Sequence, residues 1–226
     1  MAGTTTAGTP IDEVLAELAT LEDPRIREVN ARHGDDHAVN LGHLRAVAKR
    51  LKTQPDLARE LWATDDSAAK LLAVLVCRPK QFDRDELDGM LRAARTPKVH
   101  DWLVGSVVRK SPHAEALRLA WLTDPDAGVA SAGWAMTTER VARRPEGLDV
   151  TELLDVIEAE MKDAPDRLQW AMNHCLAQIG ISHARHRARA IDIGERLEVL
   201  KDYPTAPNCT SPYAPVWIAE MVRRAG

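Results

Sequence analysis

Cysteine is scarce in this sequence, and so are phenylalanine and tyrosine. Three cysteines, two tyrosines and one phenylalanine occur among 226 residues, beside six tryptophans. Cys77, Cys175 and Cys209 are an odd number, lie far apart and form no Cys-x-x-Cys pair. This pattern argues against both a disulfide framework and a structural zinc site. We interpret the three residues as buried or incidental thiols.

Long hydrophobic runs are also missing. A transmembrane helix needs about 18 consecutive apolar residues, and charged residues interrupt every run well before that length. Residues 1–10 are small and polar and lack the basic-then-apolar order of a secretory signal. We therefore expect a flexible segment over residues 1–10 and a cytoplasmic protein that does not enter membranes.

No stretch shows the sustained alternation of apolar and polar residues that is typical of strands. Apolar residues instead recur at helical spacing, as in the stripe Leu168, Ala171, Met172, Cys175, Leu176 and Ile179. Hydroxyl residues followed by proline, as at Ser111-Pro112 and Ser211-Pro212, indicate helix starts. These signals predict helices near residues 11–21, 40–53, 55–63, 66–77, 83–94, 98–110, 112–123, 126–138, 149–162, 165–180, 184–200 and 212–224.

Many short helices joined by tight turns, without a sheet, favour one architecture. Antiparallel helix pairs that stack on their neighbours bury one face of each pair and form an α-solenoid. We therefore predict an all-α, curved α-solenoid that forms a single domain over residues 11–226. No clean repeat period is visible, so the repeats have diverged. The concave face of such a stack suits a large, extended ligand.

The charges are unevenly distributed, although the net charge is only −4 and the pI is about 6.1. Residues 37–55 and 182–190 contain bases and no acid, and residues 89–114 contain five bases and one acid. Residues 145–166 contain eight acids and one lysine. This distribution favours one basic face and one acidic face. The alternative is a set of unrelated, solvated helix surfaces.

Several segments, in order along the chain, resemble the AlkD-like DNA alkylation repair family. They are HGDDHAVNLGHLRAVAKRLK (33–52), LARELW (57–62), AAKLLAVLVCRP (68–79), WAMNHCLAQIGI (170–181), RARAIDIGE (187–195) and CTSPYAPVWI (209–218). The resemblance implies HEAT-like helical repeats whose basic concave surface holds duplex DNA. It also implies removal of cationic N3- or N7-alkylated purines by cleavage of the N-glycosidic bond. We expect a monomer that binds duplex DNA, which can be alkylated, without a cofactor or a metal.

The resemblance also implies a catalytic pattern from which this sequence departs. The family sets Trp and Asp four residues apart on one helix and adds an Arg from a later helix. Here Asp101 directly precedes Trp102, and Ser106 stands four residues after Trp102. The stretch DAGVASAGWAMT (126–137) contains no arginine. Asp101 and Trp102 are therefore the candidate catalytic residues, and we leave open whether the protein is an enzyme.

Basic residues in the three charged segments are the candidates for phosphate contacts. The predicted DNA-binding residues are Arg45, Lys49, Lys52, Lys98, Ser106, Arg109, Lys110, Arg185, Arg187 and Arg189. His33, His37 and His43 have spacings found in metal sites, but Gly34, Asp35 and Asp36 between them indicate a turn, so we predict no metal. Two other functions remain open: a non-catalytic DNA-binding module, and a protein-interaction scaffold that uses residues 145–166.

Overall fold

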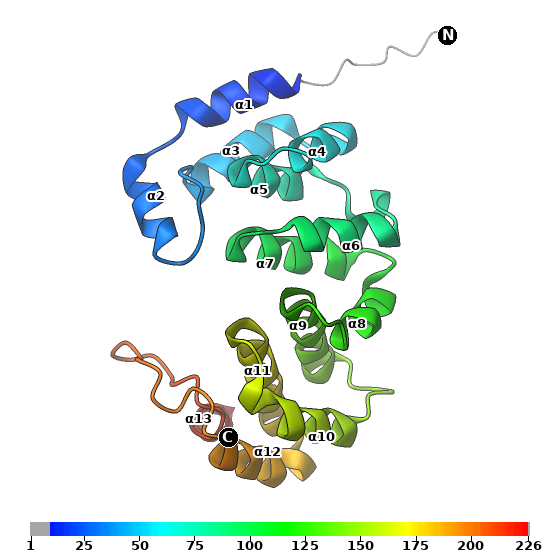
Figure 1. Cartoon of the computed structure of the whole chain (residues 1–226), viewed down its shortest axis with the longest axis vertical. Coiled ribbons are helices and arrows are strands. Elements are labelled where there is room, and N and C mark those ends of the chain that lie inside the picture. Colours follow the sequence, from blue (N-terminus) through cyan, green and yellow to red (C-terminus); the bar gives the residue numbers. More distant parts are fainter. Residues whose placement is uncertain (1–9, 226) are drawn as a thin grey trace. The chain divides into compact units, whose positions relative to one another are not determined.

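The computed structural model describes residues 10–225, which form thirteen α-helices and three short 3-10 helices and no strand (Figure 1). The α-helices are α1 (Ile11–Thr20), α2 (Pro24–Ala31), α3 (Leu41–Leu51), α4 (Pro55–Trp62), α5 (Ser67–Val76), α6 (Arg84–Ala93), α7 (Pro97–Ser106), α8 (Ala114–Leu122), α9 (Ala127–Arg143), α10 (Val150–Glu160), α11 (Asp166–Ser182), α12 (Ala184–Leu197) and α13 (Ala214–Ala225). The 3-10 helices are η1 (Pro79–Gln81), η2 (Val108–Lys110) and η3 (Met161–Asp163). The all-α class predicted from the sequence is confirmed.

Each of the twelve predicted helices is present, and the differences have local causes. Helix α2 was not predicted. It is short and largely polar, and its start is capped by Asp23, whose carboxylate accepts a hydrogen bond from the Arg25 amide at 2.8 Å. Helix α9 continues to Arg143, beyond the predicted end, because Val141 of its last turns packs into the core. Helix α12 ends at Leu197 because Glu198 is left-handed, with φ 54°.

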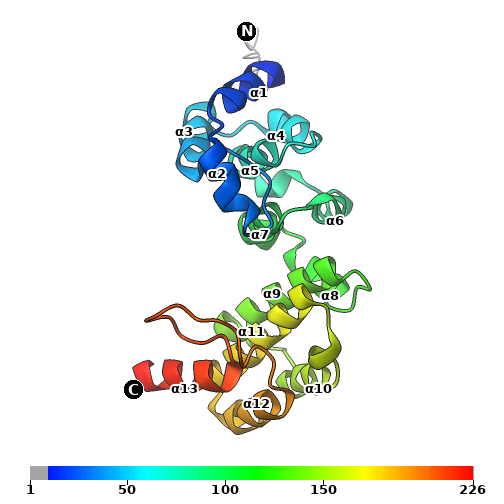
Figure 2. The same ribbon diagram turned by 60° about the vertical axis from the view of Figure 1, so that its left-hand side comes forward.

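The first of two compact units ends at Ala114. Its centre is α5, nine of whose ten residues are buried. Helix α5 packs against α3, α4 and α7, and α6 packs against α7, as both views of the ribbon show (Figures 1 and 2). Helices α3, α5 and α7 therefore form one layer, and α4 and α6 lie beside it.

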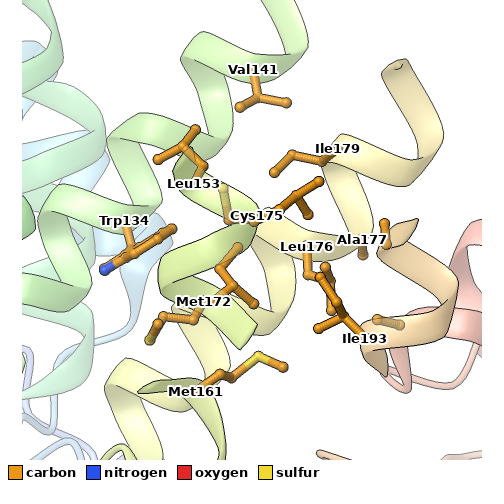
Figure 3. Packing of buried hydrophobic residues seen from close by; sticks show 14 of the residues in the cluster. Trp134, Val141, Leu153, Met161, Met172, Cys175, Leu176, Ala177, Ile179 and Ile193 are labelled. Carbon is orange, nitrogen blue, oxygen red and sulfur yellow. The ribbon is translucent and has the colours of Figure 1, made fainter. Parts of the chain in front are cut away.

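The second unit begins at Glu115 and is built around α11. This helix packs against α9, α10, α12 and α13. Its apolar stripe supplies Met172, Cys175, Leu176 and Ile179 to the core, where Trp134 of α9 and other side chains surround it (Figure 3). The stripe that predicted the helix is thus also the centre of the core.

Helix α9 approaches α8 very closely in this unit. A Cβ atom at Gly133 would lie 2.6 Å from the backbone nitrogen of Leu122, so no larger residue fits at this position. The single-domain organisation over residues 11–226 stays a prediction. The segment expected to be flexible, residues 1–10, lies outside the described residues except for Pro10. Among residues 10–225, the helices are all too short or too polar to cross a membrane.

Candidate nucleic-acid interface

The segment that joins α2 to α3 fixes the start of α7. The buried carboxylate of Asp35 accepts a hydrogen bond from the Lys98 amide at 2.8 Å, and the Lys98 ammonium lies 3.4 Å from its other oxygen. Asp35 thus caps a helix 63 residues away in the sequence. Gly34 permits the turn, with φ +79°, and places its Cα against Pro97.

The histidines with metal-like spacing include one with a clear structural role. His37 is buried, its Nδ1 lies 3.0 Å from the Val39 carbonyl, and its own carbonyl accepts a hydrogen bond from Asn30 at 2.8 Å. Burial and the nearby charge of Lys98 lower the pKa of His37. Over residues 10–225, no group of three His, Cys, Asp or Glu side chains is placed to hold a metal ion.

Two of the predicted basic segments meet at one contact in the first unit. The guanidinium carbon of Arg45, on α3, lies 5.4 Å from the ring centre of Trp102, on α7. A cation–π contact of this kind contributes about 0.5–1 kcal/mol at an exposed site. It joins residue 45 of the segment 37–55 to residue 102 of the segment 89–114. The contact holds the guanidinium on a half-buried ring.

Two other predicted basic residues lie on α3 or at its end. Arg45 and Lys49 are exposed and stand four residues apart, on one face of α3. Exposed Lys52 follows the last residue of the helix and has a positive φ of 59°. No salt bridge joins these three residues to an acid within the described part of the chain. Their neighbour Arg50, in contrast, is paired with Glu17 of α1. Three cations, two on α3 and one directly after it, thus remain available to a ligand.

The exposed face of α7 carries the candidate catalytic pair. Asp101 has a side chain 66% exposed, with one carboxylate oxygen 3.2 Å from Nδ1 of His100. Trp102 projects about 100° away from Asp101, as adjacent residues on a helix do. A Cβ atom added to Gly105 would meet nothing within 4 Å, so the surface beside both residues is open. The structure therefore brings Trp102 to Arg45, while Asp101 contacts His100.

The remaining predicted residues of this unit lie near the end of α7. Ser106 is the last residue of the helix and is partly exposed, and Arg109 and Lys110 are exposed on η2. The predicted helix over 98–110 ends as an α-helix at Ser106, and Arg109 and Lys110 belong to the 3-10 helix that follows. Lys98 is held by Asp35, as described above.

The third basic segment, residues 182–190, uses two of its arginines inside the second unit. Arg187 donates to the carbonyls of Gly180 and Ile181, at 2.8 and 3.2 Å, and so caps the end of α11. Arg189 pairs with Asp155 at 2.5 Å and with Glu158 at 2.9 Å. Arg185 is exposed, and its Nε lies 2.9 Å from Nε2 of His186.

Two of the eight acids in the segment 145–166 are bound by arginines of α12, and the expected separate acidic face stays a prediction for the others. Asp155 and Glu158 bind Arg189, and Glu158 also binds Arg196 at 2.7 Å. These hydrogen bonds lower the pKa of Glu158. Acids and bases that are separate in the sequence meet because α10 packs against α12.

Two partly exposed pairs of aromatic rings in the second unit were not predicted from the sequence. Trp170 of α11 meets Tyr203 edge to face, with ring centres 5.0 Å apart, and His174 stacks on Trp217 of α13 at the same distance. One signal was available: Trp170 and His174 are four residues apart on α11 and lie off its apolar stripe.

The comparisons with known proteins agree with these observations. A family model described as "DNA alkylation repair enzyme" matches residues 14–218. The chain belongs to the DNA alkylation repair family. A comparison with curated protein sequences finds no match.

The fold of this family member is also similar to a solved structure. That structure is described as "a new family of proteins related to the HEAT-like repeat DNA glycosylases with affinity for branched DNA structures". The TM-score is 0.77 at 22% sequence identity, over 96% of this chain and 95% of that chain. The likeness confirms the predicted α-solenoid of HEAT-like helix pairs.

An arginine does reach the stretch in which the family resemblance implies one. Ser131 lies in the stretch 126–137 of α9, and its hydroxyl oxygen accepts a hydrogen bond from Nε of Arg167 at 3.2 Å. Arg167 comes from α11 rather than from α9. The stretch itself lies in the interior, because Ala130, Ser131 and Ala132 are all buried.

Proposed function

We propose that this member of the DNA alkylation repair family binds DNA through the surface formed by α3 and α7, which we call the α3–α7 surface. It comprises Arg45, Lys49, Lys52 and Trp102. The contact between Arg45 and Trp102 carries the proposal, because it holds a guanidinium, without an opposing acid, on an exposed helix face. Arginine and lysine side chains grouped on a surface bind phosphates and fix the register of the protein on the nucleic acid.

Binding without base excision fits the arrangement around Trp102 best. In the chemistry that the family implies, an aromatic face attracts the positive charge of the alkylated purine and of the developing sugar cation. Here a guanidinium lies over the Trp102 ring. The Arg45 guanidinium would therefore repel an alkylated purine cation that approached the same face of the Trp102 ring.

The binding test compares the wild-type chain with two charge reversals. We expect the wild-type protein to bind plain duplex DNA more weakly as salt rises from about 50 to about 300 mM, because neutralised phosphates release counterions. Arg45→Glu should lower this affinity about tenfold at low salt. Arg84→Glu is the matched control, since Arg84 is exposed at the start of α6 and lies outside the α3–α7 surface. Equal losses in the two variants would contradict the proposal.

One observation favours N-glycosylase activity as a second candidate function. The exposed carboxylate of Asp101 lies beside the open surface at Gly105. There it could stabilise positive charge on a deoxyribose while water attacks and the alkylated purine leaves as a neutral base. The measurement is release of N7-methylguanine from methylated duplex DNA under single-turnover conditions. A rate above the spontaneous rate that falls in Asp101→Asn would support the enzyme, and a spontaneous rate in both proteins would exclude it.

A further inference from the structure

Two exposed apolar side chains meet in the second unit. Among residues 10–225, the large hydrophobic side chains that are exposed are Val29, Leu119, Trp170, Tyr203 and Val216. Trp170 is 37% exposed and Tyr203 is 48% exposed, and their rings touch each other. The described part of the chain thus places its two exposed aromatic side chains in one contact.

The rings come from three segments that are tied together. Trp170 and His174 stand one turn apart on α11, Trp217 belongs to α13, and Tyr203 belongs to the loop between α12 and α13. This loop extends away from the helices of the unit in both ribbon views (Figures 1 and 2). Its far end is fixed to α11 by a hydrogen bond from Nδ2 of Asn173 to the carbonyl of Pro212, at 2.9 Å.

Exposed rings recur in sites for single-stranded nucleic acid, in which aromatic faces stack on bases and cations contact phosphates. Arg167 precedes Trp170 by three residues on α11, but its guanidinium donates to Ser131 of α9. The rings, rather than this cation, therefore carry the inference.

We propose that the group formed by Trp170, His174, Tyr203 and Trp217, which we call the aromatic group, binds unpaired nucleobases of DNA. A paired duplex offers only base edges in its grooves, because its ring faces are stacked inside. Exposed aromatic faces therefore gain little from duplex DNA and much from unstacked bases, which occur in single strands and at unpaired branch points. The inference rests on the proposed DNA-binding function and adds that the protein prefers DNA with unpaired bases.

The test uses a loop residue, so that the helical core stays intact. We expect Tyr203→Ala to weaken binding of a three-way junction with unpaired bases at its branch about tenfold, because each base–ring stack contributes strongly to affinity. Binding of fully paired duplex of equal length should stay unchanged. Tyr203→Phe retains the ring and should retain junction binding. Leu119→Ala is the matched control, since it removes another exposed apolar side chain of the same unit.

A second readout reports stacking directly. A 2-aminopurine placed at the unpaired position loses fluorescence when it stacks on a ring, and Tyr203→Ala should diminish that loss. Equal affinity of wild-type protein and Tyr203→Ala for the junction, with equal fluorescence, would overturn this inference. Duplex affinity and its dependence on Arg45 test the proposed function separately. Retained duplex binding with no effect at Tyr203 would therefore reject the aromatic group alone.

Discussion

The arginines predicted to bind DNA have different surroundings in the two compact units. In the first unit, Arg45 lies on an aromatic ring with no opposing acid, and the lysines that follow it on α3 are exposed. In the second unit, Arg189 is bound by two carboxylates and Arg187 by two carbonyls. Segments that are equally basic in the sequence thus differ in how much positive charge they offer to a ligand. The difference depends on which acids the fold brings near.

The largest effect should come from an arginine that is deep inside the second unit. Arg118 has a side chain only 5% exposed and is bound by Glu115 at 2.7 Å and by Thr137 at 3.0 Å. Glu115→Gln leaves this buried charge without its counter-ion. We expect a loss of about 2–3 kcal/mol in the unfolding free energy, less than for a fully buried pair because Glu115 is half exposed.

Cysteine labelling can assign that loss to one unit. Burial raises the pKa of Cys175 to about 12 and the pKa of Cys77 to about 11, so each thiol reacts only when its own unit opens. Glu115→Gln should speed labelling of Cys175 roughly 30-fold or more and leave Cys77 unchanged. Exposed Cys209 serves as the internal control. Equal acceleration at Cys77 would show that the two units open together.

A smaller effect on DNA affinity is expected for an arginine that is paired with acids than for Arg45, which has no opposing acid. Arg189→Glu should change DNA affinity by less than about twofold, because Asp155 and Glu158 already neutralise its guanidinium. Loss of these partly exposed pairs should cost about 0.5–1 kcal/mol of stability. Competition binding, with Arg45→Glu measured in parallel, gives the change in DNA affinity. Urea unfolding gives the change in stability. A larger affinity loss in Arg189→Glu than in Arg45→Glu would reverse the comparison.

The smallest effect should be a pH dependence of the stability of the first unit, caused by His37 in the segment between α2 and α3. The pKa of His37 lies below the ordinary value of 6.5, because of burial and then Lys98. The unfolded chain therefore takes up the proton first, and the first unit loses stability as pH falls below 6.5. The stability is fully present above that pH.

The measurement is labelling of Cys77 relative to Cys209 across this pH range. The pKa values of His174 and His186 in the second unit are also lowered, so the informative quantity is the difference between wild type and His37→Gln. The variant should be less stable at neutral pH and depend less on pH. An unchanged pH dependence in His37→Gln would show that His37 does not cause the loss of stability at low pH.

Local features were predictable from the sequence. The stripe from Leu168 to Ile179 indicated α11 and its buried face, and serine–proline pairs indicated two helix starts. The family resemblance is confirmed over residues 14–218. Helix α2 was missed because its stability depends on an Asp23 cap and on packing rather than on an apolar stripe.

Pairs that are distant in the sequence were not predictable. Arg189 and Asp155 are 34 residues apart, and no local pattern shows that α10 and α12 pack side by side. The same holds for Arg45 and Trp102, which were predicted for separate roles and lie together. The sequence shows which segments are rich in charged residues, but only the structure shows which of these charges pair with one another.

Asp35 and Lys98 form another pair that is distant in the sequence, and its effect reaches beyond the two residues themselves. The Asp35 carboxylate accepts a hydrogen bond from the Lys98 amide in the first turn of α7. Lys98 stands four residues before Trp102, the residue whose ring Arg45 contacts. Substituting Asp35 by alanine would free the beginning of that helix to fray and let the ring drift from its guanidinium partner. In an affinity screen, such a change would be mistaken for damage to a ligand-contacting residue, although Asp35 is shielded from solvent and would never meet the ligand.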